Sequence, residues 1–165
     1  MQRVNETYEV TYRASRVVQD ALSILRSRTG PGAELAEPAE SNDFRHRLIL
    51  ELGGLNYEVF WITFLDTNCR VIESEVMFRG TLCSASVYPR EVAKRALDLE
   101  ASGVVLAHNH PSGQVEPSES DYRITERLIE VLDVFGIWVC DHLIVSSQDV
   151  LSMAQKGRVT FTTRH

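Results

Sequence analysis

The segment from Gly103 to Asp121, "GVVLAHNHPSGQVEPSESD", constrains the fold of this 165-residue chain more than any other stretch. Its first five residues are all apolar or glycine, which is typical of a short strand that is buried on both faces. His108 stands at the end of this strand, and a turn-forming stretch, "PSGQVEP", follows it. From residue 119 to residue 135 the apolar side chains recur at helical spacing. The segment therefore predicts a strand, a loop and a helix, in that order.

The neighbouring segments continue this alternation of strands and helices. Residues 58–66 and 70–78 are rich in β-branched and aromatic residues and predict two strands joined by a turn. Residues 89–102 predict a helix with Pro89 in its first turn, and residues 137–145 predict a further strand. We therefore expect an α/β fold in which helices pack on a mixed sheet.

The N-terminal part of the chain has a different pattern. Apolar residues between positions 8 and 27 follow helical spacing and predict an amphipathic helix. Residues 29–44 contain two prolines, two glycines and four acidic residues, and are the best candidate for a linker. Ser41, Asn42 or Asp43 is expected to cap a short helix that ends at Leu52. We therefore divide the chain into an N-terminal helix with an acidic linker, residues 1–40, and a main domain, residues 41–165.

Composition and charge narrow the class of protein. The length and the 44% hydrophobic content fit one globular domain with a substantial core. No apolar run is long enough for a membrane span or a signal peptide, so we expect a cytoplasmic protein without membrane contact. The net charge of −6 disfavours non-specific binding to DNA but does not exclude it. The cysteines form no C-x-x-C pair and are expected to be free thiols: Cys69, Cys83 and Cys140.

His108 and His110 are candidate metal ligands. Side chains two residues apart in an extended chain point to the same side. Asp121, eleven residues after His110, begins the predicted helix, and the loop between them allows it to fold back as a third ligand. Two neutral imidazoles and one carboxylate leave an open fourth position on a zinc ion. This pattern is typical of a hydrolytic rather than a structural zinc site.

Each part of this pattern also has a plainer explanation. Ser118 and Asp121 have the spacing of a capping box at the start of a helix, and taken alone the cap is the stronger explanation. A single H-x-H is likewise more often incidental than metal-binding. A helix cap does not explain two histidines that face the same way, so the features together favour a metal site. The letters "HNH" do not indicate the nucleases of that name, whose three residues are dispersed over a hairpin and a helix.

The same residues resemble a known family signature. H-x-H-P with an aspartate eleven residues after the second histidine, and a serine three before it, is similar to the JAMM motif of JAB/MPN metalloproteases. "RGTL", "PREV", "LAHNHPSG" and "DHLIV" follow the order of the RadC branch, and the resemblance covers roughly residues 42–157. It implies a deaminase-like α/β fold with zinc bound by His108, His110 and Asp121. Ser118 matches the serine that hydrogen-bonds the reacting oxygen.

The resemblance also implies a catalytic glutamate at the start of the first hairpin strand. This implies Glu58 as the general base, with Glu75 on the second strand as the alternative. Asp141 and His142 match the family pattern as well, but adjacent strand residues face opposite sides, so at most one faces the site. A core hydrogen bond is the expected role for that residue. Full-length RadC proteins begin with a helix-hairpin-helix DNA-binding domain, and the first 40 residues here show no such motif and are too few for it.

These observations predict a RadC-like, zinc-dependent hydrolase that cleaves an amide or isopeptide bond in a peptide or protein substrate. The competing hypothesis is a DNA-repair or DNA-transaction accessory protein whose metal site is structural or acts on nucleic acid. A deaminase is disfavoured, because the sequence lacks the P-C-x-x-C ligands and the H-x-E spacing of that chemistry. No particular oligomer is predicted.

Overall fold

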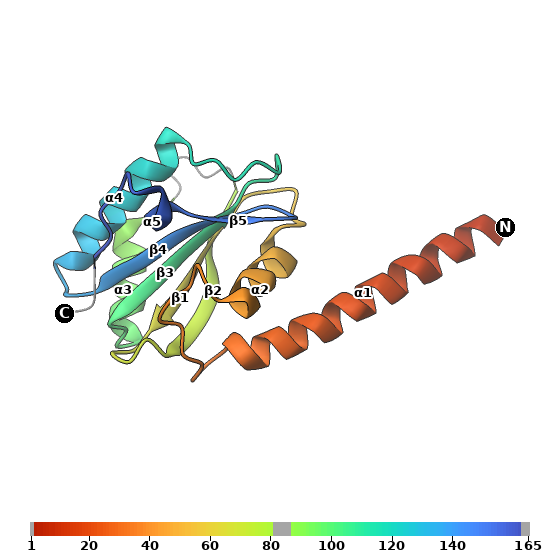
Figure 1. Cartoon of the computed structure of the whole chain (residues 1–165), viewed down its shortest axis with the longest axis horizontal. Helices are drawn as coiled ribbons and strands as arrows, with labels where there is room; N and C mark the ends of the chain where they lie inside the picture. Colours follow the sequence, from red (N-terminus) through yellow and green to blue (C-terminus); the bar gives the residue numbers. More distant parts are fainter. Residues whose placement is uncertain (1, 81–86, 163–165) are drawn as a thin grey trace.

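A computed structural model of the chain describes residues 2–80 and 87–162. Its sheet has five strands in the order β2-β1-β3-β4-β5, with β3 and β4 parallel and the other neighbours antiparallel (Figure 1). The elements in chain order are α1 (Gln2–Thr29), α2 (Asn42–Leu52), β1 (Val59–Leu65), β2 (Val71–Arg79), α3 (Pro89–Asp98), β3 (Gly103–Asn109), α4 (Glu119–Asp133), β4 (Trp138–Val145), β5 (Val150–Ser152) and α5 (Met153–Lys156). The expected mixed sheet flanked by helices is confirmed.

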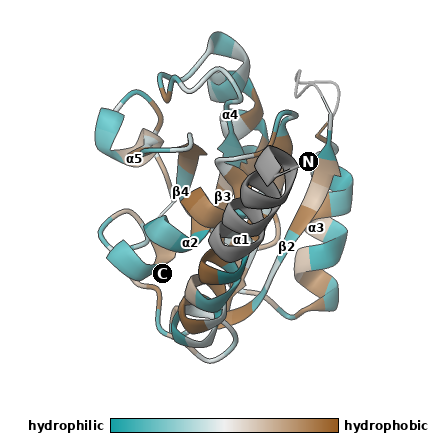
Figure 2. Ribbon diagram, turned by 90° about the vertical axis from the view of Figure 1, so that its right-hand side faces the viewer, coloured by the Kyte–Doolittle hydropathy of each residue, from teal (hydrophilic) through white to brown (hydrophobic). Residues whose placement is uncertain are grey.

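Helices cover both faces of the sheet. On β1, Phe60 and Ile62 pack in a core cluster with α3 and α4, whereas Val59 and Trp61 pack in a second cluster with α2. Successive strand residues therefore enter opposite layers, as the two-residue period of a strand requires. Figure 2 shows the hydrophobic residues concentrated along the strands between the helices. Burial on both faces explains why β1 and β3 are almost continuously apolar in sequence.

Most predicted elements of the main domain are confirmed to within a few residues. Ser41 caps α2, since its hydroxyl oxygen accepts a hydrogen bond from the Phe44 N–H at 3.3 Å. The helix expected over residues 89–102 ends earlier, at Asp98, because the chain turns at Glu100, which has a φ of 53°. Two short elements, β5 and α5, were not predicted, since three-residue and four-residue elements carry too few residues for a periodic pattern.

The segment interpreted as a linker is fixed against the hairpin. The Gly32 N–H donates to the Val71 carbonyl and the Leu35 N–H to the Cys69 carbonyl, both at 2.7 Å. The Val71 N–H donates back to the Ala33 carbonyl at 2.8 Å, and the Leu35 side chain is buried. Residues 32–35 therefore form an ordered edge beside the turn between β1 and β2. The prolines, glycines and acidic residues of segment 29–44 predicted a loop correctly, but not its attachment.

The C-terminal end of α1 contacts α2. Arg26 forms an ion pair with Glu51 at 2.7 Å, and the buried Arg47 donates to the Thr29 carbonyl at 3.0 Å. In the part of the chain that the structure describes, no helix is both long and apolar enough to cross a membrane.

Two of the three cysteines fall within the described residues. Cys69 and Cys140 are both free thiols, as predicted, and Cys83 lies outside the described residues. Burial raises the pKa of the Cys140 thiol to about 12, so this thiol stays protonated at neutral pH.

Candidate metal centre

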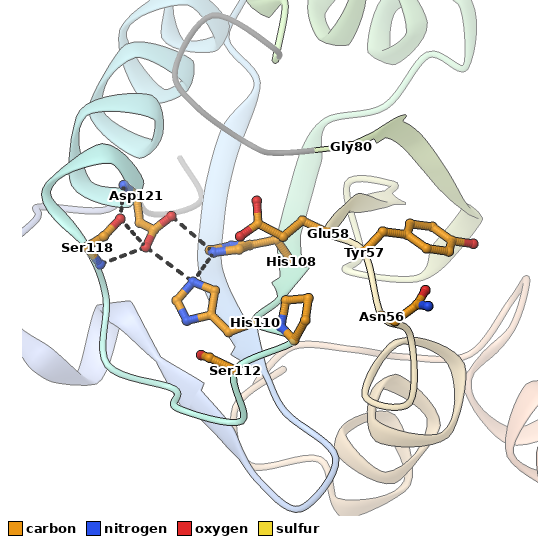
Figure 3. A pocket seen from close by; sticks show the side chains of 10 residues that line it. Asn56, Tyr57, Glu58, Gly80, His108, His110, Ser112, Ser118 and Asp121 are labelled. Atoms are coloured by element: carbon orange, nitrogen blue, oxygen red, sulfur yellow. Dashed lines mark hydrogen bonds and ion pairs between the residues drawn. The ribbon is translucent and has the colours of Figure 1, made fainter.

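The two candidate histidines stand at the C-terminal end of the central strand β3. His108 is its sixth residue, pairs with Ile144 on β4 and is buried. His110 follows directly after the strand, and its backbone N–H donates to the Val145 carbonyl at 2.9 Å. This bond extends the parallel pairing of β3 and β4 by one residue. The chain at His110 therefore stays extended, and both imidazoles face the same side (Figure 3).

The third candidate, Asp121, is brought to the histidines by the loop that follows β3. It is the third residue of α4, and it is buried. The His108 Nε2 atom lies 2.9 Å from His110 Nε2 and 3.0 Å from Asp121 Oδ1, and His110 Nε2 lies 3.5 Å from Asp121 Oδ2. One ligand atom from each residue lies within 4.8 Å of the others. The group can therefore hold a metal ion (Figure 3).

The proton of His110 is fixed by the loop itself. Its Nδ1 atom lies 2.8 Å from the Gln114 carbonyl oxygen, which can only accept a hydrogen bond. The proton of the neutral ring is therefore on Nδ1, and Nε2 carries a lone pair. This lone pair faces a carboxylate and a second imidazole nitrogen, which are also acceptors. In their neutral state these converging atoms are acceptors that only a proton or a metal ion can link, so the donor set fits a metal ion.

The charges of the group shift two pKa values in opposite directions. Burial alone would raise the pKa of Asp121, but its hydrogen bonds to His108 and His110 outweigh this effect and hold the pKa well below its usual range. The hydrogen bond to Asp121 in turn raises the pKa of His110, against the opposing effect of burial, and the charge of Glu58 contributes in the same direction. Asp121 is therefore ionised at neutral pH, as a metal ligand must be.

Ser118 and Asp121 form a capping box at the start of α4, and the cap leaves the candidate ligand geometry intact. The Ser118 N–H and hydroxyl both donate to Asp121 Oδ2 at 2.7 Å, while the Asp121 N–H donates to the Ser118 hydroxyl oxygen at 3.2 Å. The other carboxylate oxygen, Oδ1, faces His108. The two explanations weighed for this pair are thus compatible, because each oxygen of Asp121 has its own set of neighbours.

The two candidate glutamates lie in different surroundings. Glu58 directly precedes β1 and lines the same pocket as the three candidate ligands (Figure 3). Glu75 lies within β2, pairs with Ile62, and forms an ion pair with Arg95 of α3 at 2.5 Å. Glu75 is not among the residues that line this pocket.

Asn109, between the two histidines, holds the backbone on both sides of Glu58. Its carboxamide oxygen accepts from the Val59 N–H at 2.8 Å, and its Nδ2 donates to the Tyr57 carbonyl at 2.9 Å. The carboxamide is buried, so water does not compete for these bonds. The end of β3 therefore fixes the start of β1, and Glu58 with it.

Two buried residues lie behind the group, and sequence reasoning expected a core hydrogen bond for His142 without its partners and did not identify Thr125. His142 of β4 lies with its Nε2 atom 2.8 Å from His108 Nδ1, and Thr125 of α4 lies 2.6 Å from His142 Nδ1. Burial, followed by the charge of His108, lowers the pKa of His142 well below its usual range, so this ring is neutral. Asp141 faces the other side of β4, where Ser152 donates to it at 2.5 Å. The expected alternation of Asp141 and His142 is confirmed.

The pocket over the group is open and polar. It has a volume of about 590 Å³. The residues that line it are Asn56, Tyr57, Glu58, Gly80, His108, His110, Pro111, Ser112, Ser118 and Asp121. Among the described residues, the lining includes two carboxylates, Glu58 and Asp121, and no lysine or arginine.

The fold and this arrangement of histidines and aspartate define a JAB-type α/β domain. A family profile described as RadC-like JAB domain matches residues 39–158. The chain belongs to this RadC-like JAB family, which confirms the family resemblance and the JAB/MPN fold expected from the sequence.

Relatives of similar sequence are named as UPF0758 proteins. One from Vibrio cholerae is 44% identical over 142 residues, which cover 86% of this chain and 87% of that protein. One from Chromohalobacter salexigens is 46% identical over 144 residues, 85% of this chain and 63% of that protein. One from Vibrio vulnificus is 54% identical over 100 residues, 61% of this chain and 45% of that protein. The matched region thus spans most of the first relative and about half to two thirds of the other two.

Proposed function

We propose that the protein is a zinc-dependent hydrolase that cleaves an amide or isopeptide bond in a peptide or protein. The observation that carries this proposal is the convergence of three acceptor side chains, His108, His110 and Asp121, in one open pocket with Glu58. Membership in a JAB domain family supports it. The pocket leaves room beside the three side chains for a substrate group and a water molecule.

Zinc is the metal that the donor set supports best. Catalytic zinc sites use three protein ligands, commonly imidazole nitrogens with a carboxylate, and keep one further position open. Magnesium and calcium prefer oxygen ligands, whereas two of the three candidate ligand atoms here are nitrogens. The combination of His108, His110 and Asp121 therefore matches a catalytic rather than a structural zinc site.

The proposed chemistry divides the work among the residues of the pocket. Zinc, when bound, supplies a Lewis acid that polarises the substrate carbonyl and lowers the pKa of water. Glu58 accepts the proton of the attacking water and delivers it to the leaving amine. Ser118, whose hydroxyl donates to Asp121 in the resting arrangement, donates to the reacting oxygen after rotation about its Cα–Cβ bond. Asn109 keeps Glu58 in place through its two backbone hydrogen bonds.

The charge of the pocket supports a peptide substrate over a nucleic acid. Phosphate backbones are bound by lysine and arginine, and the described residues of the pocket lining include neither. Glu58 and Asp121 add negative charge, and the chain as a whole has a net charge of −6. Tyr57, which is 43% exposed at the pocket, offers an aromatic surface for a substrate side chain.

The test combines metal analysis with a substrate panel. We expect the purified protein to contain about one zinc per chain, because three ligands from one strand end and one helix start form a nearly complete site. His110→Ala should lose the zinc. The zinc-loaded protein is then incubated with extended peptides, an isopeptide-linked peptide pair and duplex DNA, and cleavage is followed by mass spectrometry and electrophoresis.

Three outcomes would contradict the proposal. The first is stoichiometric zinc in His110→Ala, which would mean that the metal binds elsewhere. The second is a zinc-loaded protein that cleaves no peptide or isopeptide bond of the panel. The third is salt-sensitive, sub-micromolar binding to duplex DNA together with DNA cleavage, which would favour an enzyme of nucleic acids.

A further inference from the structure

We propose that Thr125 and His142 fix the proton of His108 on Nδ1 and so keep its Nε2 atom available to a metal ion. This inference rests on the metal site of the proposed function and assigns it two positioning residues. Neither residue lines the pocket. Three hydrogen bonds connect these residues, and the direction of each bond determines the direction of the next.

The first bond joins Thr125 to the backbone of a candidate ligand. The Thr125 hydroxyl oxygen lies 2.6 Å from the Asp121 carbonyl oxygen, one helical turn earlier in α4. A carbonyl oxygen can only accept, so Thr125 must donate. A hydroxyl has one proton, and this bond uses it. Any other hydrogen bond that Thr125 makes must therefore be one that it accepts.

The second bond fixes the proton of His142. Its Nδ1 atom lies 2.6 Å from the Thr125 hydroxyl oxygen. Because the hydroxyl proton is already directed at Asp121, the Nδ1 atom must donate and therefore carries the proton. His142 is fully buried, with 0% exposure, so its ring is neutral and carries no second proton. Its Nε2 atom is consequently an acceptor.

The third bond transfers this direction to His108. The His142 Nε2 atom lies 2.8 Å from His108 Nδ1. Since His142 Nε2 accepts, His108 Nδ1 must donate, and the lone pair of His108 is left on Nε2. That atom is the one that lies 3.0 Å from Asp121 Oδ1 and 2.9 Å from His110 Nε2. The proton is thus kept on the side of the ring away from the candidate metal.

The three bonds form part of a closed ring through the core. They run from the Asp121 backbone through Thr125 and His142 to His108, and the His108 ring then faces the Asp121 side chain. These bonds join α4, which carries Asp121, and β3, which carries His108, through His142 of β4. Partners of this kind typically change metal affinity by about 10- to 100-fold when they are removed. The same scale is expected here.

The first experiment measures zinc affinity by competition with a chromophoric chelator. Thr125→Val keeps the side-chain shape but removes the hydroxyl, so His142 loses its acceptor and its proton is no longer held on Nδ1. We expect zinc to bind about 10- to 100-fold more weakly in this variant. Thr125→Ser restores the hydroxyl and should bind zinc within about threefold of wild type, a much smaller change than the loss expected for Thr125→Val.

Thr63, a buried threonine of β1, provides a matched control. Thr63 of β1 is also fully buried, accepts a hydrogen bond from the Trp61 indole at 3.0 Å and lies 3.0 Å from the Ser74 hydroxyl. Thr63→Val therefore removes a buried hydroxyl that is not part of the ring. It should lower the melting temperature about as much as Thr125→Val but leave zinc affinity unchanged. Equal loss of zinc in both variants would reduce the effect to general destabilisation.

The second experiment needs no variant and no metal. Two-bond proton–nitrogen NMR spectra of the metal-free wild-type protein at about pH 8, above the usual histidine pKa, distinguish the two neutral forms of each ring. We expect both His108 and His142 to carry their proton on Nδ1. In Thr125→Val the proton of His142 should move to Nε2 in a measurable fraction of molecules.

The outcomes separate this inference from the proposed function. A wild-type protein that binds no zinc contradicts the proposed function. The NMR spectra then still test whether Thr125 and His142 fix the proton of His108 on Nδ1. A proton on Nε2 of His142 in the wild-type protein would contradict the proposed directions of the hydrogen bonds. Wild-type zinc affinity in Thr125→Val overturns the inference as well, and so does weaker binding in that variant without a change at His142.

Discussion

The start of α4 and the middle of β4 each bury one aspartate, and the two differ in what their oxygens face. Asp141 accepts hydrogen bonds from the His142 and Ala154 N–H groups at 2.7 and 3.0 Å, and from the Ser152 hydroxyl. Asp121 accepts from Ser118 through one oxygen, but its other oxygen faces His108 Nε2. Both side chains are almost fully buried, so exposure does not distinguish them.

The difference shows how a structural carboxylate can be told from a candidate ligand. The three hydrogen-bond partners of Asp141 named above are all donors from the protein, so the protein itself satisfies this group. Asp121 instead lies against the Nε2 atoms of two imidazoles that can also bind a metal ion. The pKa values follow the same division: burial raises the pKa of Asp141, whereas hydrogen bonds to two histidines lower that of Asp121 despite its burial.

The largest expected effect comes from exchanging each aspartate for asparagine. Asp121→Asn removes the charged ligand, and we expect zinc affinity to fall by more than about 100-fold, beyond the range for residues that act through a ligand. Asp141→Asn is the matched variant and should bind zinc within about threefold of wild type, because it lies on the other side of β4. Chelator competition measures both. Similar losses of zinc affinity in the two variants would contradict the assignment of Asp121 as a ligand and Asp141 as a structural residue.

A second expected effect concerns Glu58 against Glu75. Glu58→Gln has nearly the same shape, so zinc content and melting temperature should stay unchanged, while hydrolysis falls by about 100-fold or more, the usual scale for general acid–base catalysis. Glu75→Gln, which loses the ion pair with Arg95, should retain full activity. Steady-state rates on a peptide cleaved by the wild-type protein provide the measurement. Loss of activity in Glu75→Gln alone would transfer the role of general base to that residue.

A third expected effect is the pH dependence of stability that Asp141 introduces. Its raised pKa means that the folded state holds the proton more tightly than the unfolded state. The associated stabilisation is present below the unfolded pKa of about 4 and is lost as pH rises through the folded pKa. Relative to Asp141→Asn, the wild-type protein should therefore lose stability upward from about pH 4.

Chemical denaturation of wild type and Asp141→Asn at several pH values checks this prediction, since other titrating groups are common to both proteins. A difference in unfolding free energy that is constant with pH, or that grows in favour of wild type, would contradict it.

The smallest expected effect comes from the surface of the loop that carries the site. Lys156 of α5 pairs with Glu116 at 2.9 Å, and both side chains are exposed. Lys156→Ala should change the unfolding free energy by no more than about 1 kcal/mol, the usual limit for exposed ion pairs. Zinc affinity should not change measurably, because buried contacts hold Asp121. A clear loss of zinc would show that the surface pair helps to position the loop.

Local rules were sufficient to predict the group of candidate ligands. His108 and His110 follow from the two-residue period of a strand, and Asp121 lies within reach because the loop from His110 is short and turn-forming. The order and approximate bounds of most strands and helices follow from the same periodicities. Each of these features depends on residues that are close in the sequence.

The features that were missed depend on residues that are far apart in the sequence. His142 reaches His108 across 34 positions, through the register in which β4 pairs with β3. Asn109 reaches the backbone on either side of Glu58 across 50 and 52 positions. No periodicity encodes these distances, because strand register is set by the packing of the whole sheet. The attachment of residues 32–35 to the hairpin was missed for the same reason.

The order of the strands also has a consequence for how the protein behaves at high concentration. The two outer strands of the sheet are β2 and β5, and an outer strand can pair with a strand of another molecule and start aggregation. At the start of β2, residues 32 and 33 already occupy the backbone groups of Val71. β5 offers only three residues, and β2 carries charged side chains at Glu73, Glu75 and Arg79. Two register irregularities bend the pairing of β2 with β1. Both sheet edges are thus poor templates for adding a foreign strand, so the domain is protected against edge-to-edge association.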